Sequence, residues 1–115
     1  METILQRLLE LDGVTGALLV GKDGLVVAST MEGEDEEFLA AMAAACYDAS
    51  TRYIEPLGLG EVWHAMFEMA GGVVQVADSG ELLIVVRSNN AANIGRVRAE
   101  SRQARLQLAE QIGSY

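Results

Sequence analysis

Cysteine, proline and positive charge are all scarce in this sequence. It has one cysteine, Cys46, and one proline in 115 residues. A single cysteine excludes an internal disulfide framework and fits a reducing compartment, which we expect to be the cytoplasm. Seventeen acidic residues against eight basic ones give a net charge of −9, which would repel nucleic-acid backbones and anionic membranes. We therefore expect a protein partner, without nucleic acid or membrane insertion.

Long apolar runs are also missing, although half of the residues are hydrophobic. No run approaches the roughly 20 apolar residues that cross a bilayer, so we predict a soluble protein. A length of 115 residues suits one core and leaves no room for a separate catalytic domain. We therefore expect residues 1–115 to form a single domain.

Residues 13–30 are the most informative part of the chain. Two runs rich in valine and leucine, 17–20 and 25–28, flank the sequence Gly-Lys-Asp-Gly at 21–24. The glycines permit the positive φ of a tight turn, so the pattern predicts a β-hairpin. Because neither run alternates with polar residues, we expect both faces of the hairpin to be covered and the hairpin to lie in the middle of a sheet.

The remaining segments predict an α+β fold. Helical spacing in 2–11, 36–55 and 90–112 indicates three helices, and the segments 61–69, 73–77 and 82–86 predict a three-stranded meander whose last strand is central. We expect Asn90 to cap the last helix, whose buried stripe consists of Ile94, Val97, Ser101, Ala104, Leu108 and Ile112. The expected order is helix, two strands, long helix, three strands, helix.

The helix at 36–55 is apolar or small on nearly all sides. At about 100° per residue, the face expected to cover the sheet consists of Phe38, Leu39, Met42, Cys46, Ala49 and Tyr53. The opposite side carries Ala40, Ala41, Ala44, Asp48, Thr51 and Arg52. A helix of this kind is normally buried twice, so we expect that side to meet a second copy, with Asp48 of one subunit reaching Arg52 of the other. Alternatively, alanine is simply a good helix former on a mildly exposed face.

Catalytic, cofactor-binding and metal-binding patterns are not visible. Residues 16–22 match G-x-x-x-x-G-K, but the intervening residues indicate a strand, and Asp23 stands where a magnesium-binding Ser or Thr belongs. His64 is the only histidine, which excludes a histidine-rich metal site, and no nucleophile elbow surrounds Cys46 or the serines. We expect a protein without enzymatic activity and without a cofactor.

The sequence resembles the roadblock family, which includes dynein light chains and bacterial and archaeal regulators of small GTPases. The resemblance rests on LDGVTGALLV at 11–20, DGLVVAS at 23–29, and Asn-Ile-Gly at 93–95 followed by Val97 and Arg98. It spans essentially the whole chain. The hairpin motif also occurs in related sensor and trafficking domains, and its combination with the last-helix motif makes it more specific. The resemblance implies an α/β sandwich whose five-stranded antiparallel sheet has the long helix on one face and the terminal helices on the other.

The resemblance also implies how two copies associate. Family members dimerise through the long helix and the third strand, which merges two sheets into one. For this chain the implied interface residues are Ala41, Ala44, Ala45, Asp48 and Arg52 in the helix, and Val62, Trp63, His64, Ala65 and Phe67 in the strand. Pairing that strand would remove an edge that could otherwise aggregate.

Function is implied by the resemblance alone. Prokaryotic members are generally partners of Ras-like small GTPases, which implies a homodimeric, non-enzymatic module that modulates the nucleotide cycle of such a GTPase. One alternative is a scaffold subunit, comparable to a motor light chain, that leaves GTP turnover unchanged. Another is a small-ligand sensor, which would need a roomy pocket between sheet and helix. We expect Phe38, Met42, Trp63 and Phe67 to fill that space.

Overall fold

The computed structural model describes residues 1–31 and 35–113. Its elements are α1 (Glu2–Leu9), β1 (Val14–Gly21), β2 (Val26–Ser29), α2 (Glu36–Ile54), the short 3-10 helix η1 (Glu55–Leu57), β3 (His64–Met69), β4 (Gly72–Asp78), β5 (Leu82–Asn89) and α3 (Ile94–Gly113). The order of helices and strands is the predicted one. The α+β fold is therefore confirmed.

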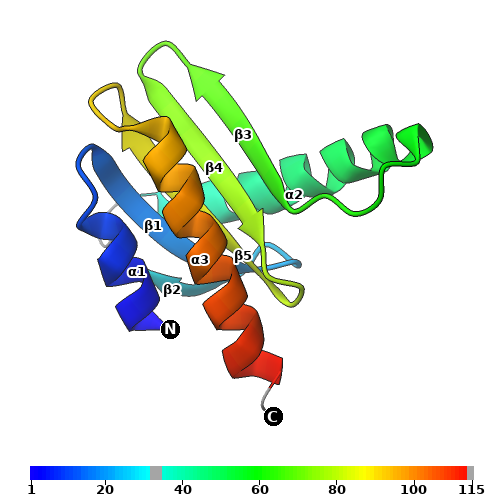
Figure 1. The fold of residues 1–115 in the computed structure, drawn as a ribbon, viewed down its shortest axis with the longest axis horizontal. Coiled ribbons are helices and arrows are strands. Elements are labelled where there is room, and N and C mark those ends of the chain that lie inside the picture. Colours follow the sequence, from blue (N-terminus) through cyan, green and yellow to red (C-terminus); the bar gives the residue numbers. More distant parts are fainter. Residues whose placement is uncertain (32–34, 114–115) are drawn as a thin grey trace.

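The five strands form one antiparallel sheet in the order β2-β1-β5-β4-β3. Figure 1 shows α1 and α3 on one face of this sheet and α2 on the other. Strand β5 is central, as predicted. The hairpin is not, because β2 forms an edge of the sheet. β2 has only 4 residues, and a register shift between Leu19 and Val20 interrupts its pairing with β1.

Strand β1 separates two cores. Ala17 and Leu19 belong to the cluster beneath α1 and α3, whereas Leu18 and Val20 belong to the cluster beneath α2. All four side chains are 0% exposed. Because both faces of β1 are covered, an alternating pattern would have placed polar groups in a core. This explains the unbroken apolar run in the sequence.

Helix α3 packs as its stripe predicts, but it begins later. Val97, Ser101, Ala104 and Leu108 are buried. The side chain of Asn93, rather than that of Asn90, caps the helix, because Asn93 Oδ1 accepts a hydrogen bond from the Arg96 N–H at 3.1 Å. The amide of Asn90 donates to the Ala70 carbonyl oxygen at 2.9 Å instead and fastens the loop before the helix. On the other side of the helix, Arg96, Arg98 and Arg102 are exposed.

The face of α2 that covers the sheet is not the predicted one. Its buried residues are Ala40, Ala43, Ala44 and Tyr47. Of the predicted set, Leu39 alone packs against a core, and five side chains are exposed instead: Phe38, Met42, Cys46, Ala49 and Tyr53. The alanines let the helix approach the sheet closely. Gly24 lies beside the helix as well, and a Cβ there would be in ordinary van der Waals contact with Ala41 Cα at 3.4 Å.

Candidate interaction surface and groove

The side of α2 turned away from the sheet is largely apolar. We call Phe38, Ala41, Met42, Ala45, Cys46, Ala49 and Tyr53 the outer face of α2; all seven residues are exposed. Phe38 is 68% exposed and Tyr53 is 88% exposed. An apolar face of this kind costs solvation free energy unless another surface covers it, so it is a candidate contact site.

The C-terminal end of α2 extends past the sheet. Figure 1 shows this end of the helix reaching beyond β3, with the following segment returning to the sheet. This segment adds two apolar side chains to the exposed surface, Leu57 at 68% and Leu59 at 88% exposure. No residue from 48 to 61 belongs to either core cluster or packs against one. The overhanging end therefore adds no side chain to the two cores.

Strand β3 is the edge of the sheet next to this overhang (Figure 1). It pairs with β4 along its whole length, and among the described residues no strand pairs with its other side. Its side chains are half-buried or exposed, and Met66 is 42% exposed. An open edge presents unpaired N–H and C=O groups to any strand that fits. The outer face of α2 and the open edge of β3 are thus the two parts of the candidate surface.

The helix residues implied by the family resemblance divide into two groups. Ala41 and Ala45 lie on the outer face of α2, and Asp48 and Arg52 are exposed beside it. Ala44 lies elsewhere, because it is 7% exposed and packs beneath the helix against the protein's own sheet. Arg52 Nη2 lies 2.9 Å from Asp48 Oδ2 of the same helix. In this subunit the arginine therefore pairs within its own chain.

The implied strand residues lie on or just before β3. Val62, Ala65 and Phe67 are partly buried and pack against the cluster beneath α2. Trp63 precedes the strand and is 58% exposed. The Arg105 guanidinium of α3 lies 5.3 Å from the centroid of the Trp63 ring, at cation–π distance. The implied strand residues lie close to the overhang, and their side chains are only partly exposed to solvent.

His64 points to the opposite face of the sheet, towards α3. Its Nε2 lies 2.7 Å from Oε1 of Gln75, a side chain that is fully buried. The Gln75 amide nitrogen in turn donates to the Ile94 carbonyl oxygen at 3.5 Å, which orients the amide and makes Nε2 the protonated nitrogen of the ring. Burial lowers the pKa of His64, and the hydrogen bond to Gln75 opposes that shift. The ring is therefore largely neutral at pH 7.

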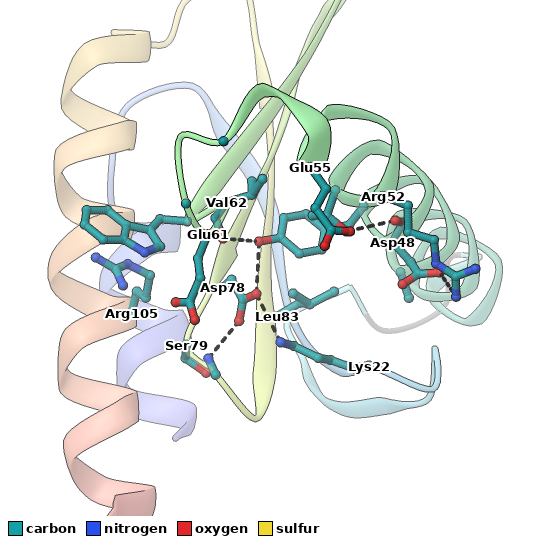
Figure 2. Close-up of a pocket in the computed structure, with 17 residues that line it drawn as sticks. Lys22, Asp48, Arg52, Glu55, Glu61, Val62, Asp78, Ser79, Leu83 and Arg105 are labelled. Atoms are coloured by element: carbon teal, nitrogen blue, oxygen red, sulfur yellow. Dashed lines mark hydrogen bonds and ion pairs between the residues drawn. The ribbon is translucent and has the colours of Figure 1, made fainter.

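A groove opens beside the C-terminal half of α2 (Figure 2). Its volume is about 910 Å³. It is lined by α2, the β1–β2 turn, the β4–β5 turn and the segment before β3, with Leu83 among its apolar residues. The prediction that four side chains fill this space is wrong for three of them, because Phe38, Met42 and Trp63 are exposed. Phe67 alone packs against the core there.

Tyr47 fixes the inner end of the groove. Its hydroxyl lies 2.7 Å from the Val62 carbonyl oxygen and 3.0 Å from Asp78 Oδ2. Lys22 Nζ donates to the same carboxylate oxygen at 3.0 Å, as Figure 2 shows. The Gly80 N–H donates to Asp78 Oδ1 at 2.7 Å. The network joins α2 to three loops at one end of the molecule.

This hydrogen-bond network has a structural role. Burial and the hydrogen bond to Asp78 both raise the pKa of Tyr47, so the phenol stays protonated and is a poor nucleophile. Sequence analysis missed this residue. The signal was the spacing of Ala40, Ala43 and Tyr47, which places them on one helix face.

Among residues 1–31 and 35–113, no group of three His, Cys, Asp or Glu side chains could hold a metal ion. Within the same described ranges, no helix has the length and apolar character that crossing a membrane requires.

Comparison with known proteins gives relatives in sequence and in structure. Two uncharacterized proteins of Methanocaldococcus jannaschii, MJ0310 and MJ0714, are 34% and 36% identical over 105 residues. The alignments cover 90% of this chain and 92% and 89% of the two relatives. These relatives match this chain over almost their whole length.

Solved structures repeat the fold. MglB of Myxococcus xanthus superposes with a TM-score of 0.89 at 22% identity, covering 98% of this chain and 94% of its own. A Roadblock/LC7 domain from Streptomyces avermitilis gives a TM-score of 0.89 at 18% identity, covering 97% of each chain. At these identities the likeness supports the fold alone. The family model described as "Roadblock/LC7 domain" matches residues 1–88, and together with the fold this match shows that the chain belongs to the Roadblock/LC7 domain family.

Proposed function

We propose that this protein is a homodimeric, non-enzymatic regulatory module that binds a Ras-like small GTPase and modulates its nucleotide cycle. The observation that carries the proposal is the exposed outer face of α2 next to the open edge of β3. Membership in the Roadblock/LC7 family supports it, because the resemblance described above implies GTPase partners for prokaryotic members. An exposed apolar surface of this kind suits a regulator that acts by binding.

A second copy is the first partner of this surface. Ala41, Ala45 and Ala49 follow one another at intervals of four residues on the outer face of α2. Small side chains at this spacing let two helices approach closely, and a two-fold pair uses the same patch on both subunits. Pairing of β3 with its symmetry mate would close the sheet edge at the same time. Asp48 and Arg52 then remain at the margin of the contact.

The GTPase is the second partner. A regulator changes a nucleotide cycle only if it binds one nucleotide state more tightly than the other, because a ligand shifts an equilibrium by its difference in affinity. In Ras-like proteins the two states differ in the order of their switch loops. We place this contact on the surface around the α2 overhang, where Tyr53, Leu57 and Leu59 are exposed.

Arg52 decides between two modes of regulation. Its side chain is 78% exposed and its partner Asp48 is 59% exposed. Such a pair contributes little to stability, so the guanidinium can leave it at small cost. An arginine offered to a GTPase in trans raises hydrolysis on the order of 10³-fold or more. If regulation works through activation, Arg52 is the residue placed to provide it.

The alternative is a light-chain-like scaffold subunit that holds a larger assembly together without changing GTP turnover. The apolar character of the outer face favours a long-lived contact of this kind, because permanent interfaces are richer in apolar surface than transient ones. The two proposals share the dimer and differ in the effect on hydrolysis.

The test uses the Ras-like GTPases encoded in the same genome, each loaded with GDP or with a non-hydrolysable GTP analogue. Binding is measured by calorimetry, and single-turnover GTP hydrolysis is measured with and without this protein. An activator predicts faster hydrolysis that Arg52→Ala abolishes, while Arg102→Ala on α3 leaves it unchanged. Tight binding with unchanged hydrolysis and no preference between nucleotide states would support the scaffold. Absence of binding to every GTPase in both states would overturn the proposal.

A further inference from the structure

The backbone of β3 offers a defined set of hydrogen-bonding groups to its open side. The Asp78 N–H donates to the Trp63 carbonyl oxygen at 2.9 Å, and these two residues continue the register of β3 with β4. In an antiparallel ladder, hydrogen-bonded and non-hydrogen-bonded pairs alternate. The backbone groups of Ala65 and Phe67 therefore point towards β4. Those of His64, Met66 and Glu68 point away from it.

The pairing of β4 with β5 gives the same alternation of hydrogen-bonded residues. The Ser79 N–H donates to the Leu82 carbonyl oxygen at 2.9 Å and continues the register between β4 and β5. Odd-numbered residues of β4 therefore bond to β5, which leaves the even-numbered ones for β3. The open edge of β3 consequently has donors and acceptors at every second residue, and any strand added there must match them.

Two copies of β3 related by a two-fold axis can meet in only a few ways. The axis can pass beside Ala65, Met66 or Phe67. In each of these cases, residues whose backbone N–H and C=O groups point outward face residues of the same kind in the second copy. An axis at Met66 pairs His64 with Glu68, Met66 with Met66, and Glu68 with His64 of the second copy, which uses every outward group of the strand. An axis at Ala65 or Phe67 leaves an outward-pointing residue of β3 without a β3 partner. The Met66 register therefore makes the most hydrogen bonds.

We propose that a second copy of this chain pairs with β3 in the register centred on Met66, so that His64 of each copy lies directly opposite Glu68 of the other. This inference rests on the proposed dimer and adds its register and its charge pairs. Glu68 is exposed, and it shares a sheet face with His64 because the two residues are four apart in a strand. Residues directly opposite in an antiparallel pair have Cβ atoms about 5 Å apart.

The side chains on the other face suit the same register. There Ala65 of one copy faces Phe67 of the other, which sets a small side chain against a large one in both symmetry-related positions. An axis at Phe67 would instead oppose two Phe67 rings. It would also pair Met66 with Glu68 of the second copy and leave both carboxylates without a positive partner. Backbone hydrogen bonds, charge and side-chain size thus favour one register.

The charge pair makes association depend on pH. In the single subunit His64 faces Gln75 of β4 and the Arg98 and Arg105 charges of α3, and its pKa lies below the usual value. The carboxylate of Glu68 from a second copy favours the imidazolium form, so the pKa of His64 is higher in the dimer than in the monomer. Association then takes up protons. The dissociation constant falls as pH is lowered from about 8 to about 6.

Disulfide trapping tests the register directly. The variants Ala65→Cys, Met66→Cys and Phe67→Cys are made in a Cys46→Ala background and oxidised mildly, and the covalent dimer is measured by non-reducing electrophoresis. With the axis at Met66, the Cα atoms of the two copies of residue 66 lie about 5.5 Å apart. The Cα atoms of the two copies of residue 65, and likewise of residue 67, lie about 7–8 Å apart. A disulfide needs Cα atoms closer than about 7 Å. We expect Met66→Cys alone to form the covalent dimer efficiently.

The charge pairs are tested by analytical ultracentrifugation. We expect the wild type to dimerise about threefold to tenfold more tightly at pH 6 than at pH 8, from two partly exposed ion pairs. Glu68→Gln should lose that pH dependence. Glu68→Lys should weaken the dimer about tenfold at pH 6, because an ammonium group opposite His64 removes the ion pair and disfavours the imidazolium form. Glu81→Lys, an exposed residue of the β4–β5 turn with the same charge change, should leave the dissociation constant unchanged.

Failure of the register and failure of the dimer give different results. A dimer that cross-links through residue 65 or 67, or that keeps its pH dependence in Glu68→Gln, overturns the Met66 register and leaves the proposed dimer intact. A wild-type protein that stays monomeric at micromolar concentration overturns both.

Discussion

Helices α2 and α3 have 19 and 20 residues and cover opposite faces of the same sheet. Helix α3 buries residues from Val97 to Leu108 and turns arginines and glutamines to solvent. Helix α2 buries only small residues and Tyr47, all within its first two-thirds, and leaves Phe38 and Tyr53 outside. The difference shows that α3 completes the core on its side of the sheet, whereas α2 leaves large apolar side chains exposed on the side turned away from the sheet.

Truncation of the α3 stripe should have the largest effect on folding. Leu108 is 0% exposed and belongs to the core beneath α1 and α3. Leu108→Ala should lower the free energy of unfolding by about 2–5 kcal/mol, through lost burial and a cavity. Urea denaturation at fixed protein concentration measures this. A loss of unfolding free energy below 1 kcal/mol in Leu108→Ala would show that α3 does not complete this core.

A charge on the outer face of α2 should break association instead of folding. Ala45→Glu places a carboxylate on the proposed interface of two acidic subunits, and we expect a dissociation constant weaker by about 100-fold. Gln103→Glu on the exposed side of α3 adds the same charge and should leave it unchanged. Sedimentation equilibrium compares the two. Equal effects of both variants would contradict the contrast between the helices.

The Tyr47 network should matter to stability and to its pH dependence. Tyr47→Phe removes a buried hydroxyl and should cost about 1–3 kcal/mol, whereas Tyr53→Phe at an exposed position should cost nothing measurable. Because the pKa of Tyr47 is raised on folding, its contribution is complete below the usual value of about 10 and is lost as pH rises above it. Wild-type stability should therefore fall more steeply than that of Tyr47→Phe above about pH 10. Parallel curves would exclude the network.

The cap of α3 should give the smallest effect. Asn93→Ala removes the side chain that accepts the Arg96 N–H and should lower the free energy of unfolding by about 1 kcal/mol. Gln103→Ala in the middle of the exposed side should change it by less than about 0.5 kcal/mol. Thermal denaturation followed by circular dichroism distinguishes these values. A neutral Asn93→Ala would mean that the loop, rather than the cap, starts the helix.

Much of the fold could be predicted because its patterns are local. The glycines at 21 and 24 and the apolar runs around them predict the hairpin, and the spacing from Val97 to Leu108 predicts the buried stripe of α3. The position of the hairpin within the sheet was wrong. Sheet order depends on which strand returns to β1 from far along the chain, and no local pattern in residues 13–30 encodes that pairing with β5.

The orientation of α2 could not be derived from amphipathicity. Large apolar residues normally mark the buried face, but here Ala40, Ala43 and Ala44 lie inward and Phe38 and Met42 lie outward. Close approach of the helix to the sheet requires small side chains, which the alanines of the inward face provide. The expectation that α2 is covered on two sides survives this correction as a proposal, with the large residues now assigned to the outside.

Trp63 is the only tryptophan in the sequence, and it lies at the mouth of the groove, just before β3, with the Arg105 guanidinium near its ring. The protein therefore carries a single indole fluorophore, at the place where the strand edge, the groove and α3 come together. Its emission gives an unlabelled optical signal for titrations of a second subunit or a GTPase. Binding at this surface can therefore be followed through the fluorescence of Trp63, without an added label.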